Sequence, residues 1–303
     1  MIKELTGRVL KSYNGYYYVK VEGEAEDYVC KLKGKMKLNR FSLVTGDFVA
    51  LETAGGHEGM LSRVLPRKNF LPRPAIANLD VFVITFACSR PDFSFLLADK
   101  LLLLSALAGI PSVLVLNKID TASETLLDGV KSVYEKIGCA VYPLSAKTGE
   151  GVGELAQLLK GKVCAFGGPS GVGKSSTINA IDSGAVLRTG SVSKKIGRGR
   201  HTTRYAQLLP FDGGYIADTP GFGNIMLEGV SPLRVAEGFR EFAAFGTGCY
   251  FHPCTHTHEP VCGIKEAVTE GFISQSRYDS YLAILEELEN LRQVQEAREW
   301  NLK

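Results

Sequence analysis

The chain has 303 residues, 45% of them hydrophobic, which is enough to bury one large core or several smaller ones and predicts two or three domains. The net charge of +3 is too small to indicate a class of partner, and seven cysteines, an odd number, argue against a secreted disulfide framework. The longest apolar segment, residues 93–110, is interrupted by Asp99 and Lys100, and no cleavable signal or spanning helix precedes the first domain. We therefore expect a cytoplasmic protein with no membrane partner.

The first part of the chain alternates apolar and polar positions in five short runs. Turn-forming pairs such as Asn14-Gly15 and Gly55-Gly56 separate the runs, which cover residues 7–10, 16–21, 27–32, 47–52 and 59–64. Five short strands in a segment of this length are typical of a small closed barrel of the oligonucleotide-binding (OB) type. We expect this barrel domain to comprise residues 1–71, and the proline-punctuated string at 68–74 to be a linker.

Lysines occupy every second position from Lys31 to Lys37. If this segment is extended, all four ammonium groups project from one side and could follow a phosphate backbone. An edge strand made positive to discourage pairing explains the same pattern. Tyr16–Tyr18 likewise suit either base stacking or the barrel core.

Strands and helices alternate in the second part of the chain. Strands are expected at 81–86, 112–116, 140–144 and 163–166, helices at 96–108 and 123–137, and a hairpin with arms at 205–209 and 215–217. This alternation predicts an α/β domain, which we place at residues 72–227.

Two short motifs follow the second and third of these strands. The tetrapeptide Asn117-Lys118-Ile119-Asp120 resembles the N-K-x-D motif with which GTPases recognise the base. The Asp120 carboxylate can accept from both N1–H and the 2-amino group of guanine, a pair that adenine does not offer. Asn117 would fix the base and its loop, and the stem of Lys118 would lie over the ring. The alternative for the tetrapeptide is an ordinary turn at a strand end.

The triplet Ser145-Ala146-Lys147 resembles the S-A-K loop, whose backbone N–H contacts the guanine oxygen in such proteins. Alone it is a weak signal. Because it follows N-K-I-D at a distance that one βα unit can cover, the two motifs together predict a guanine rather than an adenine nucleotide.

The segment Gly168–Ser175 matches the phosphate-loop pattern G-x-x-x-x-G-K-[ST] between an expected strand and an expected helix. In this context backbone N–H groups can surround a phosphate at a helix N-terminus. Lys174 would reach the terminal phosphates and Ser175 would ligate Mg²⁺. The expected contacts are Gly168, Pro169, Ser170, Gly171, Val172, Gly173, Lys174, Ser175 and Ser176. A glycine-rich turn without a ligand is the alternative, whereas a hydrolase nucleophile elbow is excluded because Val172 replaces its second glycine.

Two switch-like segments follow the phosphate loop. Residues 191–204 contain five basic residues and no acidic ones, and Gly199–Arg204 resembles switch I, whose threonine closes over Mg²⁺ and the γ-phosphate. We expect Thr203 in that role, with Thr202 second. Asp218-Thr219-Pro220-Gly221 matches D-x-x-G, with Asp218 reaching Mg²⁺ through water and the Gly221 N–H reaching the γ-phosphate.

Phe222 stands where Ras-like proteins keep the glutamine that orients the attacking water. His201 is the nearest polar candidate for this task, and a partner's phosphate is its alternative target. The predicted catalytic residues are therefore Lys174, His201, Thr203 and Gly221. The motif order, with both base motifs before the phosphate loop, indicates a circularly permuted GTPase in which switch II leads directly into the C-terminal segment.

Near the C-terminus, Cys249, Cys254, His256 and Cys262 supply three thiolates and one imidazole within fourteen residues. Four such ligands fill a tetrahedral zinc shell, so we expect a structural Zn²⁺ site. His252 and His258 are competing ligands, and reduced cysteines with surface histidines are the alternative without a metal. An amphipathic helix at 276–300 is expected to pack on this site in a mostly helical C-terminal domain, residues 228–303.

The order of barrel, permuted GTPase and Cys₃His cluster resembles the small-ribosomal-subunit-dependent GTPase A (RsgA, YjeQ or YloQ) family over essentially the whole chain. The motifs N-K-I-D, S-A-K, G-P-S-G-V-G-K-S-S, G-R-H-T-T and D-T-P-G-F carry the resemblance. It implies a cytoplasmic GTPase that binds the small (30S) ribosomal subunit and its rRNA and acts in late maturation. Hydrolysis of GTP to GDP and phosphate would be stimulated by the subunit and use Mg²⁺. We expect a monomer.

Two other classes of function stay open at this point. One is a GTP-gated RNA-binding module in which hydrolysis is incidental. The other is a structural zinc and barrel scaffold with a vestigial nucleotide site.

Overall fold

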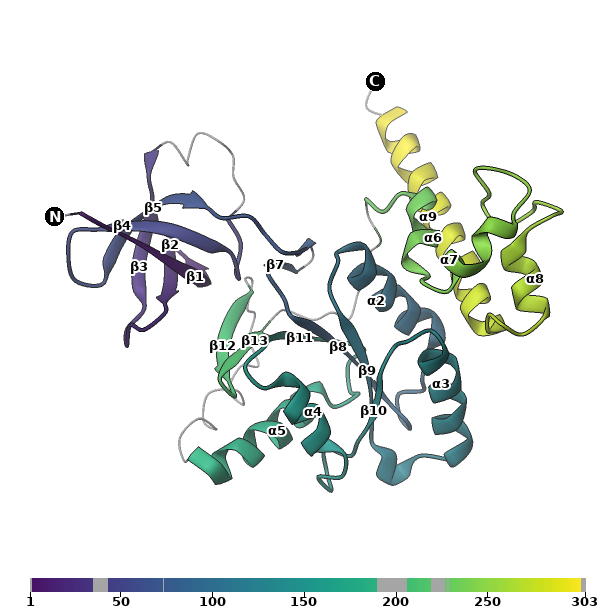
Figure 1. The fold of residues 1–303 in the computed structure, drawn as a ribbon, viewed down its shortest axis with the longest axis horizontal. Coiled ribbons are helices and arrows are strands. Elements are labelled where there is room, and N and C mark those ends of the chain that lie inside the picture. Colours follow the sequence, from purple (N-terminus) through teal and green to yellow (C-terminus); the bar gives the residue numbers. More distant parts are fainter. Residues whose placement is uncertain are drawn as a thin grey trace.

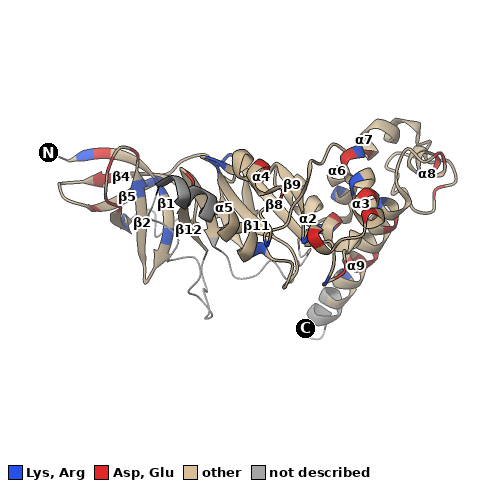
Figure 2. Ribbon diagram, turned by 90° about the horizontal axis from the view of Figure 1, so that it is seen from below, with Lys and Arg blue, Asp and Glu red and all other residues tan. Residues whose placement is uncertain are grey.

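The computed structural model describes residues 2–34, 43–72, 74–189, 206–218, 227 and 229–300, with only the backbone at 183–189, 218 and 295–300. Figure 1 shows a barrel and a helical C-terminal domain on either side of a central sheet domain, and the view from below in Figure 2 shows the same three parts in a row. None of the helices in the described ranges combines the length and hydrophobicity that crossing a bilayer requires.

The N-terminal strands close into a barrel in the order β1-β2-β3-β5-β4. The strands are β1 (Lys3–Tyr13), β2 (Tyr16–Val21), β3 (Tyr28–Leu32), β4 (Phe48–Thr53) and β5 (Glu58–Val64). Every second side chain points inward, and Val9, Val19, Cys30, Val49, Leu51 and Leu61 form a closed core. The predicted five-stranded barrel is confirmed.

The described residues include two of the four lysines in the predicted row, Lys31 and Lys33. Strand β3 ends at Leu32, and Lys33 forms an ion pair with Glu52 on β4, with 2.8 Å between Nζ and Oε1. Lys31 remains on the strand and places its ammonium group 4.8 Å from the centroid of the Tyr16 ring. Lys35 and Lys37 lie outside the described residues.

The connection at 68–74, expected as a linker, contains the first arm of an ordered hairpin. Its strands are β6 (Phe70–Pro72) and β7 (Ala75–Ala77). The Ala77 N–H donates to the Thr45 carbonyl at 3.0 Å, and the Asn78 side chain donates to the Gly46 carbonyl at 3.0 Å. These bonds attach the barrel to the central domain at the hairpin.

The central sheet has six strands in the order β10-β9-β8-β11-β13-β12, parallel except for β12. The strands are β8 (Val81–Ala87), β9 (Ser112–Asn117), β10 (Val141–Pro143), β11 (Val163–Gly167), β12 (Gln207–Phe211) and β13 (Gly214–Asp218). The topology is that of a sheet whose chain originally began at β11 and ended at β10. In this protein that chain is cut after β13, and its original ends are joined through α4 (Val152–Leu159). Sequence reasoning missed this helix. The expected circular permutation is thus visible in the topology.

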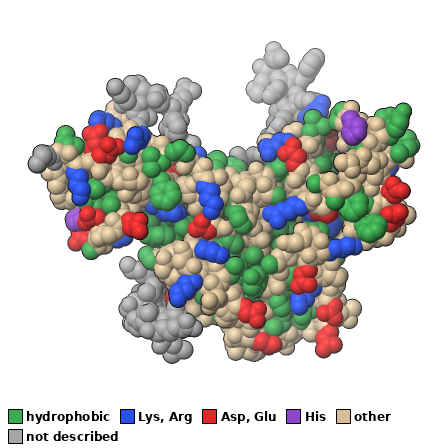
Figure 3. Space-filling model, in the orientation of Figure 1, with side chains coloured by type: hydrophobic (Ala, Val, Ile, Leu, Met, Phe, Trp, Pro, Cys, Tyr) green, Lys and Arg blue, Asp and Glu red, His purple; other side chains and the backbone are tan. Residues whose placement is uncertain are grey.

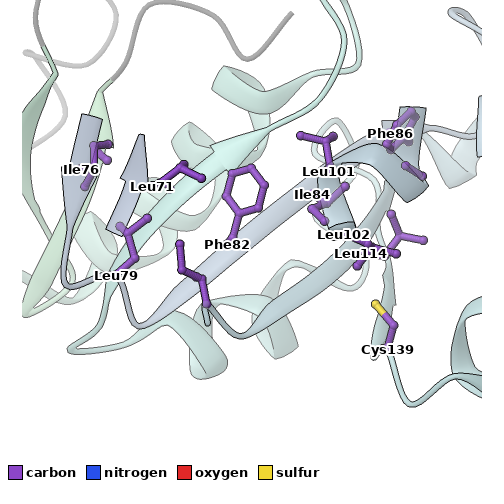
Figure 4. Packing of buried hydrophobic residues seen from close by; sticks show 14 of the residues in the cluster. Leu71, Ile76, Leu79, Phe82, Ile84, Phe86, Leu101, Leu102, Leu114 and Cys139 are labelled. Atoms are coloured by element: carbon purple, nitrogen blue, oxygen red, sulfur yellow. The ribbon is translucent and has the colours of Figure 1, made fainter. Parts of the chain in front are cut away.

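Helices cover both faces of this sheet. On β8, Phe82, Ile84 and Phe86 pack against α2 (Phe95–Leu107) and α3 (Glu124–Lys136), whereas Val81 and Val83 face α4 and α5 (Lys174–Thr189). Figure 4 shows that the first core also contains Leu71 and Ile76 of the β6–β7 hairpin. Serines at 94 and 123 cap α2 and α3, because each hydroxyl accepts a backbone N–H three residues on.

The C-terminal domain consists of α6 (Pro232–Gly238), α7 (Phe242–Phe245), the short 3₁₀ turn η2 (Gly246–Gly248), α8 (Gly263–Thr269) and the long α9 (Gln275–Trp300). Its core includes Phe239, Phe242, Tyr281 and Ile284, and it extends onto Leu103 of α2. The predicted long C-terminal helix is confirmed and packs both on the central domain and on the loop that carries the cysteines.

Candidate nucleotide site and metal centre

The phosphate loop connects β11 to α5 and is held close to its neighbours by glycines. Gly168 has a φ of +134°, and a Cβ there would lie 2.0 Å from the Thr85 carbonyl oxygen. Gly173 has a φ of +97°, and a Cβ there would lie 2.2 Å from the Asn117 amide nitrogen. Both positions require glycine for the backbone conformation and for the close approach. The loop therefore sits directly against β8 and β9.

Lys174 is the first residue of α5 and reaches back over the loop. Its ammonium group donates to the carbonyls of Gly168 at 2.8 Å and Pro169 at 2.7 Å. Burial lowers the pKa of Lys174 from its usual value. Ser175 and Ser176 are exposed in the first turn of α5, beside the positive end of the helix dipole. Together these groups form a site for polyphosphate.

Asn117 links the phosphate loop to both base motifs and is almost fully buried. Its Nδ2 donates to the Val172 carbonyl at 2.9 Å, across 55 positions of sequence. Its Oδ1 accepts from the backbone N–H groups of Lys118 at 2.8 Å and Ala146 at 3.0 Å. One side chain thus fixes the relative positions of the three segments that the sequence predicted to share a nucleotide.

At the end of the site that faces the base, neighbouring side chains fix the orientation of the Asp120 carboxylate. The Ser145 hydroxyl donates to Asp120 Oδ1 at 2.7 Å, and Lys147 Nζ lies 3.9 Å from Asp120 Oδ2. Asp120 belongs to the short turn η1 (Ile119–Thr121), which follows β9. A carboxylate oriented in this way matches a base that presents two adjacent N–H donors.

Lys118 joins the base end to the phosphate end through its side chain. It has a φ of +66°, and its ammonium group donates to the Gly171 carbonyl at 2.8 Å and to the Arg90 carbonyl. The loop at 89–92 is therefore part of the site, which sequence reasoning missed. Arg90 contributes a backbone oxygen, and a backbone oxygen leaves no signature in residue type.

Several predicted residues cannot be placed in this geometry. His201, Thr202, Thr203, Gly221 and Phe222 lie outside the described residues. The backbone of Asp218 is described and ends β13, whose Ala217 pairs with Ala165 of β11. Because parallel strands end at one edge of a sheet, Asp218 lies at the same edge as the phosphate loop.

The four predicted metal ligands form one cluster. Their ligand atoms, on Cys249, Cys254, His256 and Cys262, all lie within 4.8 Å of one another. His256 Nδ1 is 3.5 Å from Cys249 Sγ and 3.4 Å from Cys262 Sγ. His252 and His258, the competing ligands, are exposed and outside the cluster. Three sulfurs and one nitrogen at this spacing fit a tetrahedral zinc ion, with no position left for a substrate.

Residues around the cluster support its loop. From α9, the Tyr278 hydroxyl donates to the His256 carbonyl at 2.7 Å and the Tyr281 hydroxyl to the Thr255 carbonyl at 2.8 Å. The Glu259 carboxylate accepts bonds from Thr255 and Thr257; burial raises its pKa, but these bonds outweigh burial and lower it to about 2. Sequence reasoning identified the ligands and missed these three supports.

Aromatic side chains lie on the outer surface of both the barrel and the C-terminal domain. On the outside of the barrel, Lys11 lies 4.3 Å from the Tyr18 ring, as Lys31 lies near Tyr16, whereas Tyr17 packs against the core. Tyr17 therefore has the predicted core position, whereas base stacking by Tyr16 and Tyr18 stays a prediction. In the C-terminal domain Tyr250 and Phe251 are exposed, and Figure 3 shows hydrophobic side chains along the outer edge of that domain.

Family models match both of the first two domains. One described as the RsgA GTPase matches residues 64–228, and one described as the RsgA N-terminal domain matches residues 6–61. Among curated proteins, the small ribosomal subunit biogenesis GTPase RsgA of Caldanaerobacter subterraneus subsp. tengcongensis is 41% identical over 288 residues, which cover 95% of this chain and 97% of that protein. The protein of that name from Thermotoga neapolitana is 42% identical, with coverages of 95% and 98%.

Solved structures agree with these matches. The crystal structure of YjeQ from Thermotoga maritima superposes with a TM-score of 0.83 at 36% identity, covering 94% of this chain and 99% of that one. The crystal structure of YloQ, described as a circularly permuted GTPase, gives a TM-score of 0.80 at 28% identity, with coverages of 95% and 96%. The similarity thus includes all three domains.

Proposed function

Because this chain belongs to the RsgA family of circularly permuted GTPases, we propose that it hydrolyses GTP to GDP and phosphate during biogenesis of the small ribosomal subunit, the role for which its relatives are named. The observation that carries the proposal is the position of Asn117, which bonds the phosphate loop and both base motifs at once. Those three segments are far apart in the chain and have one common ligand chemistry, that of guanosine triphosphate.

The described residues divide the work of binding between the two ends of the site. Asp120 accepts the two donors of guanine and is held for that purpose by Ser145, while a backbone N–H of the Ser145-Ala146-Lys147 loop contacts the guanine oxygen. Gly168 to Ser176 surround the phosphates, and Lys174 exchanges its loop carbonyls for phosphate oxygens. Ile119 contributes the backbone of the base turn.

For hydrolysis we assign the remaining roles by motif. Lys174 stabilises charge on the β- and γ-phosphates, the Gly221 N–H bonds the γ-phosphate, and His201 positions the attacking water in place of the glutamine that Phe222 replaces. The family uses Mg²⁺, which neutralises phosphate charge when bound; Ser175, Thr203 and Asp218 are the residues that would hold it. The exposed hydroxyl of Ser175 at the start of α5 fits this role.

The ends of the molecule are proposed to contact the subunit. The cations and tyrosines on the outside of the barrel suit rRNA, because ammonium groups pair with phosphates and exposed rings stack on bases. The cysteine cluster is proposed to hold one structural Zn²⁺. We further propose that the protein acts as a monomer in the cytoplasm, where its ribosomal partner is made, with domains at 1–71, 72–227 and 228–303.

The test is GTPase activity measured with and without small subunits across a series of salt concentrations. We expect stimulation by subunits, with GTP and not with ATP, that weakens as salt rises because phosphate contacts release counterions. Activity that subunits leave unchanged would favour an RNA-binding module with incidental hydrolysis. Lys174→Ala should abolish nucleotide binding while the circular dichroism spectrum is preserved, and nucleotide binding that persists would contradict the assigned phosphate site.

A further inference from the structure

Glu259 is a buried carboxylate inside the metal loop, residues 249–262, but it is not one of the four ligands. Its Oε1 accepts from both the backbone N–H and the hydroxyl of Thr255, each at 2.6 Å. Its Oε2 accepts from the backbone N–H of Thr257 at 2.9 Å. Thr255 and Thr257 precede and follow His256 in the chain. The Glu259 side chain is therefore hydrogen-bonded to the residues on both sides of this ligand.

The backbone between these two threonines is held in an unfavourable conformation. His256 has a φ of +57°, in the left-handed region that a residue with a Cβ rarely adopts. Such a conformation persists only where surrounding bonds impose it. In this conformation the imidazole Nδ1 lies 3.5 Å and 3.4 Å from the sulfurs of Cys249 and Cys262. The bonds to Glu259 are therefore made by the same turn that orients the His256 imidazole toward the two sulfurs.

The carbonyls of the same turn bond to a different element. Tyr278 and Tyr281, on α9, donate to the carbonyls of His256 and Thr255. The backbone N–H groups of Thr255 and Thr257 thus donate to Glu259, whereas the carbonyls of Thr255 and His256 accept from α9, and none of these bonds requires a metal ion. Cys254 is joined directly to Thr255, so the same bonds restrain a second ligand.

We propose that Glu259 is the positioning residue of the Cys₃His centre, which preorganises Cys254 and His256 for a tetrahedral ion and selects Nδ1 as the nitrogen ligand. The inference rests on the zinc site proposed above. Preorganisation raises affinity because the loop is ordered before the ion binds. Partners that orient metal ligands in this way typically change metal affinity by about 10- to 100-fold when they are replaced.

The test compares metal binding by three variants of the full chain. Glu259→Gln keeps the size of the side chain but turns an N–H donor toward the donors of the turn. Thr255→Val removes one of the three bonds and leaves the carboxylate. Glu270→Gln, at the exposed C-cap of α8, removes one charge from the same domain and serves as the matched control. Zn²⁺ affinity is measured by competition with a chromophoric chelator, and the visible absorption of the Co²⁺ form reports the ligand set.

We expect Zn²⁺ affinity to fall about 10- to 100-fold in Glu259→Gln and several-fold in Thr255→Val, and to stay within about twofold in Glu270→Gln. The d–d bands of the Co²⁺ form of Glu259→Gln should shift away from a three-sulfur, one-nitrogen environment as the hold on His256 loosens. A variant that is merely less stable would keep the spectrum of the parent protein.

The outcomes separate the two levels of the proposal. If the unaltered chain binds less than one Zn²⁺, the zinc centre itself is wrong. If it binds one Zn²⁺ and Glu259→Gln binds it equally well with an unchanged Co²⁺ spectrum, only the role of Glu259 is overturned. Should Glu259→Gln fail to fold, Thr255→Val decides, and parental affinity in that variant overturns the proposal.

Discussion

The guanidinium Nη1 of Arg277 in α9 donates to Asp99 Oδ1 in α2 at 2.6 Å, although 178 positions separate the two residues in the chain. The Arg277 Nε also donates to Glu241 Oε1 at 2.7 Å, just before α7, and the Tyr134 hydroxyl of α3 donates to Asp99 at 2.9 Å. The side chains of Arg277, Asp99 and Tyr134 are buried and that of Glu241 is only 8% exposed, and burial raises the pKa of Asp99 despite the neighbouring arginine. The C-terminal domain is thus fastened to the GTPase domain by a desolvated charge network.

Replacement of Arg277 should destabilise the protein strongly. Arg277→Met leaves two buried carboxylates without their cation, and removal of one partner from a buried pair costs about 3–5 kcal/mol. The measurement is the free energy of unfolding in denaturant. Arg234→Met is the matched control, because the Arg234–Glu237 pair is exposed and should change stability by no more than about 0.5 kcal/mol. Equal effects of the two substitutions would contradict the structural role of the network.

Asp120→Asn should change which base is bound. Loss of two charge-assisted bonds, each worth about 1.5–3 kcal/mol, predicts GTP binding weaker by roughly 10²- to 10⁴-fold. Xanthine carries a 2-oxo group where guanine has its amino group, so the N–H of the new side-chain amide in the variant can donate to it. Xanthosine triphosphate should therefore bind the Asp120→Asn variant more tightly than it binds the parent protein. Calorimetry with both nucleotides measures the switch. Unaltered GTP affinity would remove the carboxylate from base recognition.

His201→Ala should slow hydrolysis without loosening the nucleotide. A residue that positions the water acts on turnover, so we expect a rate lower by roughly 10²-fold and a GTP Kd within about twofold of the parent value. His57→Ala is a suitable control, since His57 is a barrel residue paired with Glu26. Single-turnover kinetics with subunits present provide the measurement. A rate that matches the parent would assign His201 to another task.

The cysteines should divide into two classes by reactivity. Burial raises the pKa of Cys30, Cys88 and Cys139 to about 11 and that of Cys164 to about 12. At pH 8 roughly one thiol in a thousand or fewer is then ionised at these positions, so they should not react with a thiol reagent in the native state.

The second class comprises the three cysteines of the metal cluster, and chelation of the metal tests their reactivity. Removal of zinc frees the ligands Cys249, Cys254 and Cys262 and opens their loop, so these three thiols should become reactive while the other four stay protected. Mass spectrometry after labelling identifies the modified positions. Rapid labelling of the three ligands before chelation would argue against a bound metal.

The sequence predicted those parts of the fold that leave a local pattern. The strands of the barrel, the sheet and the helices at 124–136 and 275–300 were placed to within a few residues, because alternation, caps and long amphipathic faces are local signals. The Cys₃His ligand set was also predicted, because the short spacing between its members in the chain restricts which residues can share one metal ion. The helices α6 to α8 were not predicted, because each is four to seven residues long and too short for a periodic pattern.

Long-range contacts were beyond sequence reasoning for a different reason. The apolar run at 93–110 offered Asp99 only as an interruption, and nothing near it in the chain identifies Arg277 as its partner. The Arg90 carbonyl bonds Lys118 through an atom that every residue has. The β6–β7 hairpin contains prolines, which favour a loop in isolation, and its Leu71 and Ile76 are buried in a core that is built mainly by the next domain.

The attachment of the barrel at one end of the central sheet has a further consequence. The Thr45 hydroxyl donates to the Ala206 carbonyl at 2.7 Å, and the β6–β7 hairpin joins the same two domains, while Arg277 fastens the C-terminal domain at the opposite end (Figure 1). Both outer domains are therefore attached to the central domain, the barrel beside β12 and the C-terminal domain on α2. If the barrel and the C-terminal domain both contact the subunit as proposed above, a particle whose two contact surfaces match their spacing is bound at both ends at once, and avidity favours that particle.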